Sequence, residues 1–166
     1  MSIQTRLGKL YPNAKYSFDT DTYISIWRYH YSPDVFPSLY ENLTEIIERG
    51  VIKSTYPVLI ELERQRDEIY DYFSNFELLF VEPTEEEQKF VNYLTNHHDF
   101  DKWGGGDSEK HYADPFVVAL AKIHDLKVET YETRNNLNSI GRACELLNVE
   151  ICRFIDFLRY EDLIFR

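Results

Sequence analysis

The sequence contains no apolar run approaching the roughly 20 residues that a membrane-spanning helix needs. Its first residues also lack the apolar core of a signal peptide. The two cysteines, Cys144 and Cys152, are too few for a disulfide framework or a structural zinc site. These absences predict a cytoplasmic protein with reduced thiols and no membrane partner.

An excess of basic residues is missing as well. The chain has 18 Lys and Arg against 29 Asp and Glu, a formal net charge of −11 at pH 7, which excludes a polybasic footprint for nucleic acid or membrane surfaces. The acidity is concentrated in residues 61–101, where 12 acids and 3 bases supply 9 of the 11 excess charges. Such clustering is typical of a solvated helical face; a partner-binding surface and a metal site are the alternatives.

The apolar content is that of a folded domain, because 43% hydrophobic and 16% aromatic residues exclude a disordered chain. Short strand-like runs alternate with amphipathic stretches. The expected strands are residues 16–19, 51–54, 78–81, 126–131 and 150–154. Their connections are too long for hairpins, which predicts an α/β fold with a mostly parallel sheet covered by helices on both faces.

The expected helices have recognisable starts. They are a helix from Pro37 to about residue 49, a long one over residues 57–73, and others over 84–96, 114–124, 140–147 and the end of the chain. Ser38 with Glu41, and Thr84 with Glu87, have the spacing of capping boxes. Asp114 is expected to be the N-cap of its helix.

Four acidic residues stand at comparable positions in the expected sheet. Asp19 ends the first strand, and Glu61 lies one turn into the helix after the second. Asp114 caps its helix, and Glu132 follows the fourth strand. In an open parallel sheet, ligands bind beyond the carboxyl ends of the strands, at the point where strand order reverses. Carboxylates that converge there repel one another unless a cation lies among them. Oxygen ligands without a His or Cys cluster favour Mg²⁺ or Mn²⁺, which substrate phosphates complete, so phosphodiester hydrolysis is the matching chemistry.

Each acid also has a simpler interpretation. Asp114 alone fits an N-cap followed by Pro115 as the first helical residue. Glu61 alone fits an ordinary helix-surface acid, and Glu129 competes with Glu132 for the fourth position. The set favours a site because each acid falls at the same expected edge of the sheet.

Three motifs carry a family resemblance in their order along the chain. They are Phe-Asp-Thr-Asp-Thr-Tyr-Ile at residues 18–24, Tyr-Ser-Pro-Asp-Val-Phe-Pro at 31–37 and Ala-Asp-Pro-Phe-Val-Val-Ala at 113–119. Together they resemble PIN-like domains, the nuclease fold of VapC-type toxins, and in particular an uncharacterised branch with an Asp-Thr opening and an Ala-Asp-Pro helix start. The resemblance predicts an N-terminal extension at residues 1–15 and a PIN-like nuclease domain at 16–166.

The resemblance implies a three-layer α/β/α sandwich with a parallel sheet of about five strands. It places the family's four acids on Asp19, Glu61, Asp114 and Glu132, and matches Thr130 to a Thr that often precedes the fourth acid. It further implies a Mg²⁺- or Mn²⁺-dependent ribonuclease with an RNA substrate, a cognate antitoxin as protein partner and a possible homodimer.

Two positions depart from the family pattern and leave alternatives open. Asp21 stands where Ser or Asn is usual, so it either adds a metal ligand or tightens the loop, and Glu132 stands where Asp is frequent. The spacing of Asp19 and Asp21 also fits a haloacid-dehalogenase-type phosphatase, although Tyr23 occupies a position where that family has Thr or Val. A non-catalytic PIN-like interaction module is the other alternative, against which the complete set of four acids argues.

Some remaining features are weaker. Gly104–Gly106 is not a P-loop, because no Gly-Lys-Ser/Thr follows at the required spacing. Arg134, Lys110 and Lys102 are candidate phosphate contacts. Four aromatic residues fit base stacking, a core or a dimer face, with core or interface favoured: Tyr23, Trp27, Tyr29 and Tyr31.

Overall fold

A central five-stranded sheet organises the protein, for which a computed structural model describes residues 8–103, 112–132 and 140–165. The strands are β1 (Tyr16–Phe18), β2 (Ile52–Thr55), β3 (Phe80–Val81), β4 (Lys127–Glu129) and β5 (Ile151–Cys152). All neighbours pair in parallel, in the order β3-β2-β1-β4-β5. The predicted parallel sheet of about five strands is therefore confirmed.

Strand order reverses between β1 and β4. The chain runs outward from β1 to β2 and β3, then returns to the other side of β1 for β4 and β5. The carboxyl ends of β1 and β4 thus form the switch point at which open α/β sheets bind ligands.

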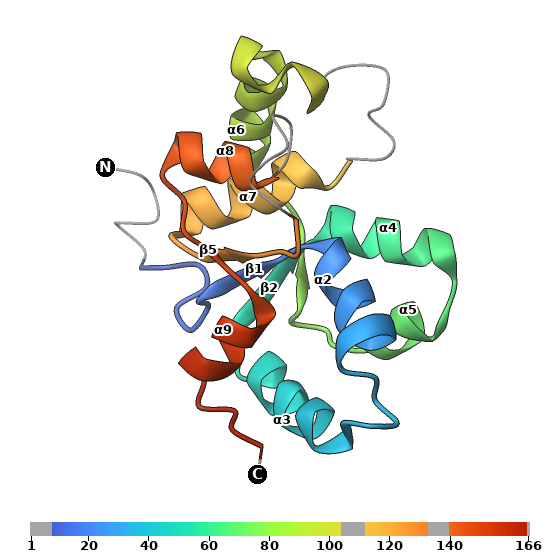
Figure 1. The fold of residues 1–166 in the computed structure, drawn as a ribbon. Coiled ribbons are helices and arrows are strands. Elements are labelled where there is room, and N and C mark those ends of the chain that lie inside the picture. The colour runs from blue at the N-terminus through green and yellow to red at the C-terminus, as the bar shows by residue number, and fades with distance from the viewer. Residues whose placement is uncertain (1–7, 104–111, 133–139, 166) are drawn as a thin grey trace.

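Helices cover both faces of this sheet, as Figure 1 shows, with α6, α7 and α8 on one side and α3 and α9 on the other. The described helices are α2 (Thr20–Ser25), the π-helical turn η1 (Ile26–His30), α3 (Pro37–Glu48), α4 (Tyr56–Gln65), α5 (Glu68–Phe73), α6 (Glu85–Asn96), the 3₁₀ segment η2 (His98–Trp103), α7 (Asp114–His124), α8 (Ile140–Leu147) and α9 (Phe154–Tyr160). The architecture is the expected three-layer α/β/α sandwich. None of the described helices is long and apolar enough to cross a membrane.

Aromatic rings fill the layer between the sheet and α9. Phe18 of β1 meets Phe157 of α9 edge to face at 5.3 Å, and Tyr16 meets the same ring at 5.0 Å. On the opposite face α7 contributes a fully buried apolar stripe that includes Val117 and Leu120. The central strands β1 and β2 are buried along their whole length, as expected for a parallel sheet covered on both faces, although β2 contains Lys53, Ser54 and Thr55.

The single helix expected over residues 57–73 is wrong in the structure, which has two helices there. Arg66 ends α4 in a left-handed conformation with φ 44°. Asp67 then begins α5, because its carboxylate accepts the backbone N–H groups of Ile69 and Tyr70. One non-helical residue and a new N-cap are enough to turn the chain.

Helix starts were predicted with mixed success. The capping box of Thr84 and Glu87 is confirmed. The one proposed for Ser38 is wrong, because α3 already begins at Pro37 and has no side-chain cap. Asp114 is likewise not an N-cap: Ala113 holds that position and Asp114 is the first helical residue of α7.

Candidate active site

Asp19 lies at the switch point between β1 and β4. Its backbone N–H donates to the carbonyl of Glu129 at 3.1 Å, which continues the β1–β4 pairing by one residue. Its side chain is 3% exposed and makes no capping bond to α2, although Asp19 is the N-cap residue of that helix. The carboxylate instead accepts the hydroxyl of Thr130 at 2.9 Å.

Thr130 connects two of the predicted acids. Its hydroxyl donates to Asp19 and accepts the backbone N–H of Glu132 at 3.1 Å, which uses both capacities of a hydroxyl group. The Glu132 carboxylate in turn accepts the backbone N–H of Ile140, the first residue of α8, at 2.9 Å. The Thr130 hydroxyl therefore connects the Asp19 carboxylate to the backbone of Glu132, whereas Glu129 contacts Asp19 through its backbone carbonyl.

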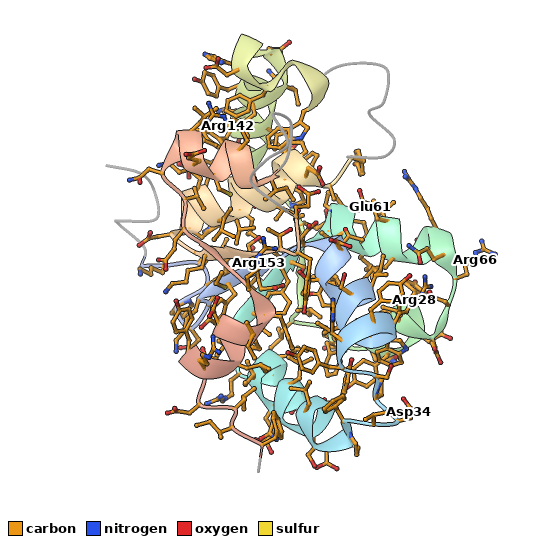
Figure 2. All side chains as sticks on the ribbon, in the orientation of Figure 1. Arg28, Asp34, Glu61, Arg66, Arg142 and Arg153 are labelled. Carbon is orange, nitrogen blue, oxygen red and sulfur yellow. The ribbon has the colours of Figure 1, made fainter. Side chains whose placement is uncertain are left out.

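Glu61 joins the start of α2 to the start of α7. One carboxylate oxygen accepts the Thr20 hydroxyl at 2.5 Å and the other accepts the backbone N–H of Ala113 at 2.9 Å. Thr20 and Ala113 are the chain neighbours of Asp19 and Asp114. Glu61, which Figure 2 shows on α4, is thus not an ordinary surface acid but a link between the chain segments that carry the buried acids Asp19 and Asp114.

The buried acids carry strongly shifted pKa values. Burial is the largest cause that raises the pKa of Asp114 to about 10, and the neighbouring charges add to it, in decreasing order those of Asp19, Glu132, Glu61 and Asp21. Burial also raises the pKa of Asp19 well above its ordinary range, with the Glu132 charge next, while the Thr130 hydrogen bond opposes the shift. We call the five interacting residues the acidic cluster: Asp19, Asp21, Glu61, Asp114 and Glu132.

The chemistry of the acidic cluster suits a hard divalent cation, although its carboxylates do not form a complete coordination site by themselves. Among the described residues, no three His, Cys, Asp or Glu side chains are close enough to form a complete metal site. Burial and the neighbouring carboxylates raise the pKa values of Asp19 and Asp114, so ionised carboxylates are costly there, and a bound cation would stabilise their ionised form. Mg²⁺ is commonly held by one or two carboxylates and completed by water and phosphate, which suits this donor set.

Asp21 and Glu129 behave differently. Asp21 accepts the Ser25 hydroxyl one turn along α2 at 3.3 Å, while its charge acts on Asp19 and Asp114. Glu129 is fully buried in register with Phe18, and neither of its carboxylate oxygens has a hydrogen-bond partner among the described residues. Burial raises the pKa of Glu129 well above its ordinary range. Asp21 therefore belongs to the acidic cluster, whereas Glu129 lies behind it.

The predicted basic contacts cannot be placed. Arg134, Lys110, the Gly104–Gly106 segment and the side chain of Lys102 lie outside the described residues. The structure instead brings Arg153 to the site, where its guanidinium donates to the Thr130 carbonyl at 3.2 Å. No sequence signal marked Arg153, because its approach depends on β5 lying beside β4.

The aromatic stretch divides between core and surface. Tyr23 is buried and its hydroxyl lies 2.5 Å from that of Ser54, and Trp27 packs against Tyr40 and Tyr72. The core interpretation is confirmed for these residues. Tyr29 is 72% exposed.

A surface cavity of about 680 Å³ lies away from the acidic cluster, at the amino ends of β1 and β4. Lys15, Lys122 and Lys127 line it together with Asp125 and Glu150. Lys15 pairs with Glu161 at 3.3 Å. This end of the sheet therefore carries paired lysines and carboxylates, whereas the acidic cluster lies at the other end.

The fold is that of a PIN-like α/β/α domain. Eight chains of solved structures match it, among them one from the crystal structure of VapBC2 from Rickettsia felis bound to a DNA fragment from their promoter. That match has a TM-score of 0.50 and 16% sequence identity, and covers 83% of this chain and 97% of the other, so the likeness concerns the fold. The chain belongs to the DUF4411 family, a domain of unknown function that it matches over residues 16–165. No curated protein matches the sequence.

Proposed function

We propose that this protein is a Mg²⁺- or Mn²⁺-dependent endoribonuclease, and that it is the toxin of a toxin–antitoxin pair. One observation carries the proposal. Asp19 and Asp114 are buried at the switch point of the sheet, and each has its pKa raised by the same neighbouring carboxylates. Closely spaced, perturbed carboxylates at the carboxyl ends of parallel strands favour a catalytic metal site.

The four predicted site residues take distinct roles in this proposal. Asp19 is the central metal ligand, Asp114 and Glu61 share the cation or orient the attacking water, and Glu132 serves a second, weaker site. When bound, the divalent cation supplies an activated water and neutralises charge on the transferring phosphoryl group.

The protein itself contributes preorganisation. Thr130 holds the Asp19 carboxylate, the Thr20 hydroxyl and the Ala113 N–H hold Glu61, and an N–H at the start of α8 holds Glu132. Carboxylates held in place by these hydrogen bonds do not have to reorient while charge develops on the phosphate. Such preorganisation is often the largest single contribution to catalysis.

The net charge of −11 is compatible with an RNA substrate. A cation bound in the acidic cluster would make the local electrostatic potential favourable for a phosphate group. The net charge of the whole protein therefore affects the affinity for RNA but does not exclude phosphodiester hydrolysis. The acidic residues of 61–101, outside most of the cluster, offer a surface for a cognate antitoxin. The fold likeness to a chain of the VapBC2 complex supports that partner.

The test is RNA cleavage in Mn²⁺ by the wild-type protein and by the Asp19→Asn and Asp114→Asn variants. We expect each substitution to reduce the cleavage rate at least about 100-fold, since each removes a charge that holds the cation. Asp34→Asn is the matched control, because Asp34 is exposed on the connection before α3, remote from the acidic cluster (Figure 2). Cleavage that persists unchanged in Asp19→Asn would contradict the proposal.

A non-catalytic PIN-like module is the second candidate. The observation in its favour is that no three metal-binding side chains among the described residues are already gathered as a complete site. Titration of Mn²⁺ into wild type and into the Asp19→Asn, Asp114→Asn double variant separates the two functions. Equal, weak binding by both proteins would favour the module.

A further inference from the structure

Two aromatic rings stack on each other beside the acidic cluster. The rings of His30 and Tyr131 have centroids 4.9 Å apart and planes within 10° of parallel. His30 ends η1 and is exposed, and Tyr131 follows β4 and is half-buried. Tyr31 makes a tilted contact with His30 and packs at steep angles against the exposed Phe36 and the buried Phe154.

The stack is joined to the acidic cluster from two directions. Tyr131 lies between Thr130, whose hydroxyl holds Asp19, and Glu132, so its Cα is about 3.8 Å from the Cα of each neighbour. His30 belongs to the continuous helical segment that begins directly after Asp19. The Asp21 charge of the acidic cluster also acts on the Tyr131 hydroxyl, so the stack is close to the cluster and belongs to the same two chain segments.

A positive charge accompanies the rings. The Arg153 guanidinium, held by the Thr130 carbonyl, acts electrostatically on the Tyr131 hydroxyl. Figure 2 shows Arg153 at the start of α9. A guanidinium matches phosphate geometry, and in a chain of net charge −11 its position beside the rings provides charge complementarity to a polynucleotide backbone.

We propose that His30, Tyr131 and Arg153 form a nucleotide subsite that stacks one unpaired base of single-stranded RNA and binds its phosphate next to the acidic cluster. The inference rests on the proposed function and extends it to substrate form. In the proposed complex the base stacks on the exposed ring of His30, which is itself stacked on Tyr131, and so becomes the third ring of the stack. A base inside a duplex is already stacked on both sides, so this subsite selects unpaired RNA.

Binding of short oligonucleotides tests the subsite without any cleavage. Fluorescence anisotropy in EDTA measures the affinity for the labelled hexamer UCAUCA and for an abasic hexamer with the same ribose-phosphate backbone. Both wild type and the Asp19→Asn, Asp114→Asn variant are used, so that any effect of the two buried acids on phosphate binding is measured separately. Stacking predicts a preference for the base-containing hexamer of about 5- to 150-fold.

Substitutions then assign the preference to the rings. Tyr131→Ala and His30→Ala should bring the ratio of the two affinities close to one, whereas Tyr131→Phe should retain it. Arg153→Gln should weaken binding of both hexamers by a similar factor and leave the ratio unchanged. Tyr29→Ala is the control, because Tyr29 is an exposed aromatic residue of the same η1 segment outside the stack.

Equal affinity of wild type for both hexamers, failure of both proteins to bind UCAUCA, or a ratio that survives Tyr131→Ala in a folded variant would overturn the subsite. Folding of each variant is checked by its circular dichroism melting curve. Cleavage in Mn²⁺ is measured separately. A base preference without cleavage would contradict the nuclease proposal alone, and cleavage without a base preference would contradict the subsite alone.

Discussion

Replacing Asp114 with Asn should make the metal-free protein more stable. In the folded protein, burial and neighbouring carboxylates raise the pKa of Asp114 to about 10, whereas in the unfolded chain the group has its ordinary value of 3.8. Between these two values the folded state binds more protons than the unfolded state. The free energy of unfolding therefore falls as the pH rises through this window.

The size of the effect follows from the shift. At pH 7, about three pH units above the ordinary pKa, the buried group costs at most about 4 kcal/mol. The Asn amide keeps the shape and removes the charge, but its buried polar atoms cost about 1–3 kcal/mol where they lack partners. The expected net gain is about 1–3 kcal/mol, or a Tm higher by roughly 3–10 °C.

Urea unfolding in EDTA, followed by circular dichroism, measures this gain. At pH 7 Asp114→Asn should exceed wild type, and at pH 4.5 the difference should shrink by about 3 kcal/mol because folded wild type then carries the proton at little cost. The control Asp34→Asn, at an exposed position, should stay within about 0.5 kcal/mol at both pH values. A less stable Asp114→Asn protein at pH 7, with a difference independent of pH, would refute the reasoning.

Three further predictions concern neighbouring residues. Thr130→Val removes the donor to Asp19 and should lower Mn²⁺-dependent cleavage about 10- to 100-fold, whereas Thr130→Ser should retain it; equal rates would contradict the positioning role. Glu129→Gln should raise the free energy of unfolding at pH 7 by at least about 1 kcal/mol and less at pH 4.5, because burial raises the pKa of Glu129; urea unfolding decides this, and a pH-independent loss would oppose it. Asp67→Ala should lower the free energy of unfolding by about 1 kcal/mol, since it removes the N-cap of α5, and an unchanged value would show that the cap is dispensable.

The sequence was sufficient to predict the sheet and the edge at which the acids meet. Short strand-like runs alternate with amphipathic helical stretches, and connections too long for hairpins favour parallel pairing. Because parallel strands end at one edge and the helices that return the chain begin there, the positions of Asp19, Glu61, Asp114 and Glu132 already indicated a common site. Their convergence depends on topology more than on side-chain detail.

The contacts that refine the site could not be predicted in this way. Hydrogen bonds from Thr20 and Ala113 to Glu61 join residues about 41 and 52 positions away in the chain, and no local pattern encodes such pairs. The approach of Arg153 to Thr130 requires β5 to lie beside β4. The break at Arg66 depends on a single left-handed residue, which helical periodicity cannot reveal.

The direct test of the account is the position of Mn²⁺ in crystals of the protein soaked with that ion, located by anomalous scattering. The account predicts a peak within coordination distance of the Asp19 carboxylate, beside Asp114, and loss of that peak in the Asp19→Asn, Asp114→Asn variant. A protein that binds Mn²⁺ only elsewhere, or an equal peak in the double variant, would contradict the claim that these buried acids form a metal-dependent active site.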